Sequence, residues 1–232
     1  LYIQRRSEII VNNIRSFSWT VICLAVVVGL GGIVVWNWLS GVEASAAWSA
    51  ADKPPVLLVN AQNPLPEGFE PGELVNLYEQ KRHFLLASSD LYLERETFEA
   101  ANRMFKQAED ENLNGFILTS GYRSAEKQAE VFAESPENTA QEPGYSEHQT
   151  GMVFDVTAYS DDGSFESTEQ FEWLEEHCWQ YGFILRYPEG KESITGIDYE
   201  PWHYRYVGKE AAAIIHETGW TLEEYCENCS ML

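Results

Sequence analysis

Residues 146–155 read SEHQTGMVFD, and a second short stretch, EPWH, ends at His203. Together the two stretches supply two imidazoles, a candidate carboxylate ligand in Asp155 and a further carboxylate in Glu200. A catalytic zinc ion takes three protein ligands from His, Asp, Glu or Cys and keeps a fourth position open for water. His148, Asp155 and His203 make up such a set. Glu200 lies close to a ligand in the sequence without being one, so it is a candidate general base.

These residues also have ordinary roles when each is taken alone. A single histidine in a folded domain is commonly a surface or hydrogen-bonded residue, and an aspartate commonly caps a turn. Glu200 precedes Pro201, which favours extended or turn geometry. Spacing alone therefore leaves two schemes open. Glu200 is either the base beside three ligands or a ligand itself, with Asp155 as a structural acid.

The sequence around these stretches alternates between short apolar and amphipathic segments. Residues 94–112 place Phe98, Met104 and Phe105 at helical spacing among charged residues, and residues 124–132 begin with a serine suited to cap a helix. Short strands and helices without a regular βαβ alternation indicate the α+β class. The other predicted features are a strand at 56–59, an irregular arm through residue 72, Gly115 as the end of the first helix, a strand at 116–118, a helix at 168–181, strands at 183–185 and 203–207, and a helix at 209–217.

A family resemblance covers roughly residues 56–225. The pattern S-x-H-x-x-G-x-x-x-D followed by E-x-W-H occurs with SGYRS at 120–124, GFILRYP at 182–188 and the stretch 199–208. This combination closely resembles the VanY-type D-alanyl-D-alanine carboxypeptidases, zinc DD-peptidases that share their fold with hedgehog signalling domains. The resemblance implies a single α+β domain in which helices flank a small antiparallel sheet.

The resemblance also assigns roles to individual residues. It implies that His148, Asp155 and His203 bind Zn²⁺ and that Glu200 is the catalytic base. Arg123 is implied as a contact to the substrate and the transition state, and a guanidinium suits both an oxyanion and a chain-end carboxylate.

Three further residues are weaker candidates for contacts to the substrate. Ser146 and Gln128 offer neutral hydrogen bonds, and Tyr187 lies in one of the matching stretches. Gln128 on a helix surface and Tyr187 in the core are equally good interpretations.

The function implied is removal of the terminal D-Ala from peptidoglycan stem peptides. One alternative is an LD-carboxypeptidase that acts on tetrapeptide stems, since the two activities share zinc chemistry. Another is a non-catalytic, zinc-containing cell-wall-binding module, although a binding module has no need of Glu200 beside an open metal position.

An apolar run precedes the resembling part. Residues 19–39 are almost all apolar, and at about 1.5 Å per residue such a helix spans about 30 Å, the thickness of a hydrocarbon core. Arginines lie before the run and tryptophans at its far end, which predicts a single-pass anchor with an extracytoplasmic catalytic domain. Cleavage near residues 44–47 and secretion is the alternative. The expected organisation is a cytoplasmic segment at 1–18, the anchor at 19–39, a linker at 40–55, the domain at 56–225 and a tail at 226–232.

Charge is distributed unevenly along the chain. The net charge is −22, yet the first 50 residues carry more basic than acidic side chains. The predicted outer domain is therefore strongly acidic, which disfavours binding to the phosphates of nucleic acid.

Two cysteines lie near the end of the chain. Cys226 and Cys229 form a C-x-x-C pair, and two thiols alone do not complete a structural zinc site. The sequence predicts a local disulfide in an oxidising compartment, with a redox role as the alternative.

Overall fold

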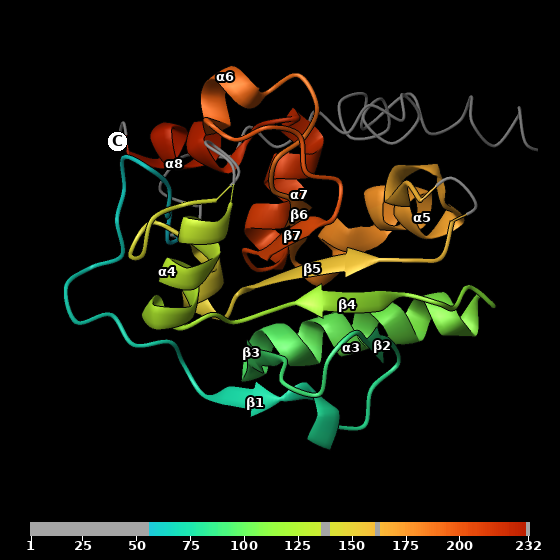
Figure 1. Ribbon diagram of the computed structural model, residues 1–232. Helices are drawn as coiled ribbons and strands as arrows, with labels where there is room; N and C mark the ends of the chain where they lie inside the picture. Colours follow the sequence, from blue (N-terminus) through green and yellow to red (C-terminus); the bar gives the residue numbers. More distant parts are fainter. Residues whose placement is uncertain (1–55, 136–139, 161–162, 231–232) are drawn as a thin grey trace, which may run out of the picture. The chain divides into compact units, whose positions relative to one another are not determined.

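The computed structural model describes residues 56–135, 140–160 and 163–230. Its central feature is a five-stranded sheet with the order β2-β4-β5-β7-β6 (Figure 1). All neighbouring strands in it are antiparallel except β2 and β4, so the expected antiparallel sheet is a mixed one. A two-stranded antiparallel sheet joins β1 to β3. The strands are β1 (Leu74–Asn76), β2 (Leu85–Leu86), β3 (Tyr92–Glu94), β4 (Ile117–Ser120), β5 (Val153–Thr157), β6 (Phe183–Leu185) and β7 (His203–Tyr206).

The helices form where the sequence places apolar residues at helical spacing and suitable caps. The side chain of Ser124 accepts a hydrogen bond from the Lys127 amide at the start of one helix, and Thr168 does the same for Phe171 at another. The helices are α3 (Arg95–Asp110), α4 (Ala125–Glu134), α5 (Glu169–His177), α6 (Glu192–Thr195), α7 (Lys209–Thr218) and α8 (Leu222–Ser230).

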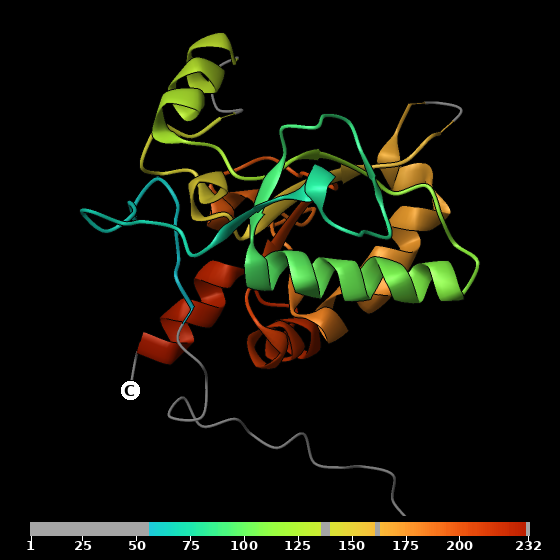
Figure 2. The ribbon, with the colours of Figure 1, turned by 90° about the horizontal axis from the view of Figure 1, so that it is seen from below.

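The main hydrophobic core lies between the sheet and helices α3 and α5, and Figure 2 shows α3 lying across this side of the molecule. Phe105 of α3 contacts Phe154 of β5, with the ring centroids 5.8 Å apart. Phe154 in turn stacks on Tyr204 of β7 at 5.9 Å. A second, smaller cluster of apolar side chains packs α7 and α8 against β6.

Successive side chains along β5 and β7 point alternately to the hydrophobic core and to the face of the sheet that carries polar residues. Phe154 and Tyr204 belong to the core, while their neighbours Asp155 and His203 lie on the opposite face, because successive side chains of a strand point to opposite sides. The antiparallel register pairs Asp155 directly with His203. This pairing places two polar side chains side by side on a rigid element.

Three details differ from the expectations. Residues 56–59 do not form a strand; the Leu57 carbonyl instead accepts a hydrogen bond from the Arg205 side chain. Helix α3 ends at Asp110, before Gly115, because Asn112 takes the positive φ (68°) that closes it. Helix α8 was not predicted, and it runs through the expected domain boundary at residue 225.

The predicted N-terminal segments at 1–18, 19–39 and 40–55 lie outside the described residues. Within the part of the chain that is described, no helix has the length and apolar character needed to cross a membrane. The side chain of Cys229 also lies outside the described set, so its disulfide with Cys226 stays a prediction.

Candidate metal centre

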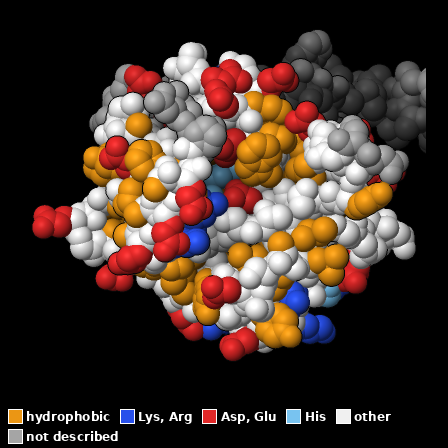
Figure 3. Space-filling model, in the orientation of Figure 1, with side chains coloured by type: hydrophobic (Ala, Val, Ile, Leu, Met, Phe, Trp, Pro, Cys, Tyr) orange, Lys and Arg blue, Asp and Glu red, His pale blue; other side chains and the backbone are white. Residues whose placement is uncertain are grey.

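A cleft with a volume of about 190 Å³ opens on the polar face of the sheet. Figure 3 shows a histidine at the bottom of a hollow in this face, with acidic, basic and hydrophobic side chains around it. Every residue that the sequence singled out lines this cleft. These residues are Arg123, Gln128, Ser146, His148, Asp155, Tyr187, Glu200 and His203.

Asp155 and His203 reach the cleft from the paired strands β5 and β7. Their register brings Oδ1 of Asp155 within 3.2 Å of Nδ1 of His203. Both side chains are almost completely buried. Although burial alone raises the pKa of a carboxyl group, contacts with His148, His203 and Arg123 hold the pKa of Asp155 below its usual range. Asp155 is therefore an anion in position to bind a cation.

His148 comes from the short 3₁₀ helix Glu147–Thr150, which immediately precedes β5. Gly151 ends this turn with a φ of 74°, a conformation that favours glycine. The Nδ1 atom of His148 donates a hydrogen bond to the Gly121 carbonyl at 2.7 Å. This bond leaves Nε2 as the coordinating atom, an arrangement that metal-binding histidines commonly show.

The three side chains fit a zinc ion. Ligand atoms from His148, Asp155 and His203 all lie within 4.8 Å of one another. Zinc bonds of about 2.0 to 2.1 Å at tetrahedral angles separate neighbouring ligand atoms by about 3.3 Å. Nδ1 of His203 lies 3.2 Å from Oδ1 of Asp155, and Nε2 of His148 lies 3.5 Å from Oδ2 of the same carboxylate. In addition, none of the described residues provides a hydrogen bond to the buried Oδ1 of Asp155.

The two imidazoles differ in how strongly they hold a proton in the metal-free protein. Burial lowers the pKa of His148 to about 4, so its ring is neutral and able to bind metal at neutral pH. Burial also opposes a charge on His203, but the neighbouring carboxylates of Asp155 and Glu147 outweigh it and raise the pKa to about 9. Zinc must therefore displace a proton from His203.

Glu200 lies at the edge of this set and is not part of it. Its Oε2 is 3.4 Å from Nδ1 of His203, and its backbone carbonyl accepts a hydrogen bond from the His203 amide. Burial raises the pKa of the Glu200 carboxyl to about 7, against the lowering effect of His203. A carboxyl group with a pKa near neutrality is well suited to accept and return a proton.

Arg123 reaches the cleft from the segment between β4 and α4. Its Nη2 donates hydrogen bonds to Oγ of Ser120 at 2.8 Å and to Oδ2 of Asp155 at 3.3 Å. These contacts hold a guanidinium beside the proposed metal, where developing negative charge needs a fixed cation.

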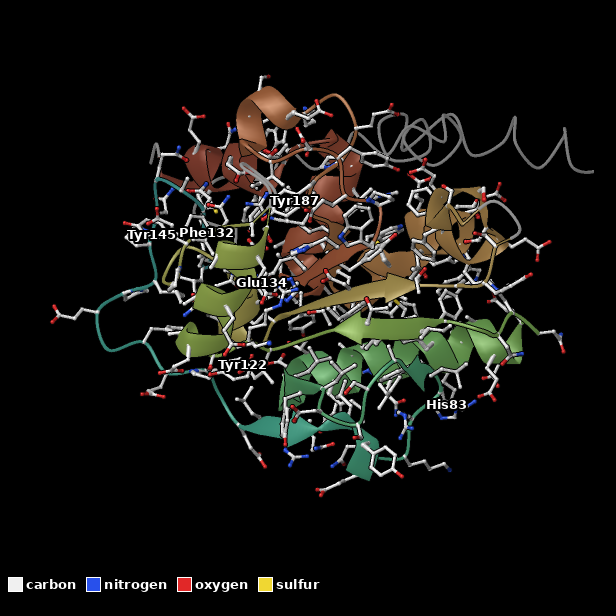
Figure 4. The ribbon with its side chains drawn as sticks, viewed as in Figure 1. His83, Tyr122, Phe132, Glu134, Tyr145 and Tyr187 are labelled. Carbon is white, nitrogen blue, oxygen red and sulfur yellow. The ribbon has the colours of Figure 1, made fainter. Side chains whose placement is uncertain are left out.

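The three weaker candidates also lie at the cleft. Gln128 is buried, and its Nε2 donates to the Gln141 carbonyl while its Oε1 has no hydrogen-bond partner among the described residues. Tyr187 packs its ring 4.8 Å from the His203 ring. Figure 4 labels Tyr187 and, on helix α4, Phe132 and Glu134; Tyr187 and the α4 residue Gln128 line the same cleft.

Some residues of the cleft were not predicted. Val131, Ile197 and Trp202 add apolar surface to its wall, and Glu147 lies beneath His203. The position of Trp202, one residue before a predicted ligand, was the available signal, since a half-exposed aromatic next to a site residue suits contact with a substrate. Nothing in the sequence pattern singled out Val131 or Ile197.

Comparison with known proteins shows what the chain is similar to. A family model described as "VanY: D-alanyl-D-alanine carboxypeptidase" matches residues 90–209. A D-alanyl-D-alanine carboxypeptidase of Enterococcus faecium is 37% identical over 175 residues, which cover 74% of this chain and 57% of the relative. The chain thus spans little more than half the length of that relative.

Two solved structures resemble the described fold. The LD-carboxypeptidase LdcB, studied for its recognition of peptidoglycan, is 36% identical with a TM-score of 0.64, over 74% of this chain and 85% of the other. A zinc-bound D,D-pentapeptidase VanY from a VanB-type vancomycin resistance cassette is 35% identical with a TM-score of 0.60, over 77% of this chain and 98% of the other. The Zn²⁺ in that neighbour agrees with the ligand set found here.

Proposed function

Because the chain belongs to the VanY family of D-alanyl-D-alanine carboxypeptidases, we propose that it removes the terminal D-Ala from peptidoglycan stem peptides with the help of zinc. The observation that carries this proposal is a buried carboxyl group beside a complete ligand set. Glu200 has a pKa near 7 and lies 3.4 Å from His203 without joining the ligands. A module that only binds its target has no use for such a group.

The roles of the residues follow from their positions. Bound zinc, held by His148, Asp155 and His203, supplies Lewis-acid activation of the attacking water. Glu200 accepts the proton of that water and passes it to the amine of the leaving D-Ala. Arg123 donates hydrogen bonds to the oxygen that gains negative charge, or to the carboxylate that marks the end of the substrate chain.

The cleft suits the end of a short peptide. A volume of about 190 Å³ is small for a ligand pocket and leaves little room beyond one or two small residues. Ser146 and Gln128 line it with neutral polar groups, and we assign them contacts to the substrate. Tyr187, which is buried against His203, shapes the wall.

Release of D-Ala from a pentapeptide stem tests this proposal. We expect the full chain to release D-Ala, a chelator to abolish the release, and added Zn²⁺ to restore it. Release that continues unchanged after the zinc has been removed would contradict a metal mechanism.

The likeness to LdcB favours one second candidate, cleavage of the L,D bond in a tetrapeptide stem. The two activities differ in the stereocentre on the acyl side of the bond. Mass spectrometry of the products from muropeptides that end in D-Ala-D-Ala and in a single D-Ala distinguishes them. Loss of D-Ala from the pentapeptide alone supports the first assignment, and loss from the tetrapeptide alone supports the second.

We also propose that residues 19–39 anchor the enzyme in the cell membrane, with the catalytic part on the outer side. The uncharged apolar run and the arginines before it support this topology. Protease added to cells stripped of their wall should then remove the catalytic part from the membrane fraction. Complete protection would reverse the topology.

A further inference from the structure

Glu147 is a buried carboxylate that touches the proposed metal ligands without joining them. It belongs to the same turn as His148, and only 2% of its surface is exposed. Its Oε2 lies 3.6 Å from Nε2 of His203, the ring nitrogen that faces away from Asp155 and Glu200. A buried carboxylate in this position stays ionised only where neighbouring groups compensate its charge, and its burial calls for a functional explanation.

Two buried arginines provide the compensating charge. Arg186 donates from Nε to Oε1 of Glu147 at 2.8 Å, and Nη1 of Arg205 lies 2.9 Å from the same oxygen. Both arginine side chains are completely buried. These contacts hold the pKa of Glu147 below its usual range although burial opposes the charge. Burying three charged groups is costly unless their geometry is well satisfied.

A second carboxylate completes the balance of charge. Glu223 of α8 forms a two-pronged ion pair with Arg186, in which Nη1 and Nη2 donate at 2.9 and 2.5 Å. Asn60 in turn donates to Glu223 at 3.0 Å. Neither Asn60 nor Glu223 falls within the residues that the family model matches. Both ends of the described chain therefore support the ion-pair cluster beneath the metal site.

The two oxygens of Glu147 are used differently. Oε1 accepts a hydrogen bond from Arg186 and forms an ion pair with Arg205, whereas Oε2 has no hydrogen-bond partner among the described residues, and neither has Nε2 of His203. These two unpartnered atoms lie 3.6 Å apart. A proton on Nε2 directed at Oε2 leaves the lone pair of Nδ1 to point at Asp155 Oδ1, which is the metal side.

We propose that Glu147 is a positioning residue for His203. It accepts the Nε2 proton of His203, which fixes the tautomer and the orientation of the ring so that Nδ1 binds zinc. Arg186 and Arg205 keep the carboxylate in place. Partners of this kind orient metal-binding histidines in other proteins, and their loss typically lowers metal affinity about 10- to 100-fold. The inference rests on the zinc site of the proposed function, but not on the identity of the substrate.

The competing explanation is that Glu147 only neutralises the two arginines. Glu223 provides a matched control, because it neutralises the same Arg186 and has no contact with His203. The substitutions Glu147→Gln and Glu223→Gln each remove one negative charge from the cluster. A purely structural role predicts that both lower the stability and that neither has a specific effect on zinc.

The decisive measurement is zinc affinity of the full chain, by competition with a chelator and without any substrate. We expect Glu147→Gln to weaken zinc binding about 10- to 100-fold and to alter the visible spectrum of the Co²⁺-substituted protein, while Glu223→Gln leaves both unchanged. Equal zinc affinities in the two variants and the wild type would overturn the proposal. A weakening of zinc binding of the same size in both variants would also overturn the proposal.

A third variant covers the case in which Glu147→Gln does not fold. Glu147→Asp keeps the charge that the arginines need but withdraws the carboxylate from His203 by one methylene. It should fold and still bind zinc more weakly than the wild type, and wild-type affinity in it contradicts the proposal. Because zinc binding is measured without substrate, a wild-type protein that binds zinc but releases no D-Ala argues against the proposed function alone.

Discussion

The guanidinium of Arg123 contributes to the cleft both a positive charge and a planar set of hydrogen-bond donors. The guanidinium bridges Ser120 and Asp155 with a single nitrogen, Nη2, which leaves its other donors for the substrate. Burial lowers the pKa of Arg123, opposed by Asp155 and Glu200, but an arginine stays protonated throughout the physiological range.

Replacing Arg123 by lysine should distinguish the effect of its positive charge from the effect of its planar guanidinium geometry. Arg123→Lys keeps a cation near Asp155 but loses the planar, two-pronged donor, so we expect zinc binding to persist and kcat/KM to fall. Steady-state kinetics and zinc content of the purified variant provide the measurement. Unchanged kinetics would show that Arg123 has a structural role only.

The motif names residues that line one cleft in the structure, whereas their contacts could not be predicted from the sequence. Spacing alone did not decide whether Glu200 or Asp155 binds the metal. The structure favours Asp155, because it groups with His148 and His203 and Glu200 does not. Glu147 was overlooked since a glutamate beside a histidine is ordinary in a sequence, and only its burial reveals it.

At the scale of elements, the register between β5 and β7 assembles the centre. It pairs Asp155 with His203 and sets Phe154 against Tyr204 on the core side. A shift of one residue would exchange the two faces, so the hydrophobic core fixes the proposed metal ligands in place. Because 47 residues separate Asp155 from His203 in the sequence, local periodicity cannot predict that the two residues pair. The same limit explains why the short strands β1, β2 and β3 were not predicted.

The close approach of β3 to the end of β4 supports His148. A Cβ atom on Gly121 would lie 2.4 Å from the Tyr92 carbonyl oxygen, so one of the two segments must move if any side chain is added. The Gly121 carbonyl is also the acceptor for Nδ1 of His148. Glycine at this position therefore allows the packing and lets the Gly121 carbonyl orient His148, a proposed metal ligand.

Gly121→Ala should weaken both the fold and the metal site. Overpacking of this kind typically costs about 1 to 3 kcal/mol, and the displaced carbonyl no longer orients His148, so zinc affinity falls as well. Gly190→Ala is the control: its Cβ meets no atom within 4 Å, and only its positive φ of 78° adds strain. Thermal unfolding and chelator competition measure the two effects. Wild-type zinc affinity in Gly121→Ala would contradict the assigned role.

At the scale of the whole molecule, the acidic chain buries a compact set of cations and anions around one cleft. The prediction of an α+β domain is confirmed, while the sheet is mixed and α8 closes the ion-pair cluster through Glu223. Helix α8 escaped prediction because its apolar positions are few.

Zinc affinity should depend on pH through His203. In the metal-free protein its pKa is raised to about 9, whereas His148, at about 4, carries no proton above pH 5. One proton must therefore leave when zinc binds, and affinity should fall about tenfold per pH unit between pH 8 and 6. Chelator competition at several pH values measures the slope, and a flat profile contradicts it.

The same raised pKa affects the stability of the metal-free protein with a definite sign. Protonated His203 stabilises the fold fully below its unfolded value of about 6.5, and this contribution is lost as the pH rises through about 9.

The most direct test of the central claim compares Glu200→Gln with His203→Ala, because the two residues are neighbours with different assigned roles. Zinc content and D-Ala release are measured side by side on both variants. Glu200→Gln spares every ligand, so it should bind zinc as the wild type does while turnover falls about 10²- to 10⁴-fold. His203→Ala removes a ligand and should lose both metal and activity. Full activity in Glu200→Gln, or loss of its zinc, would contradict the account.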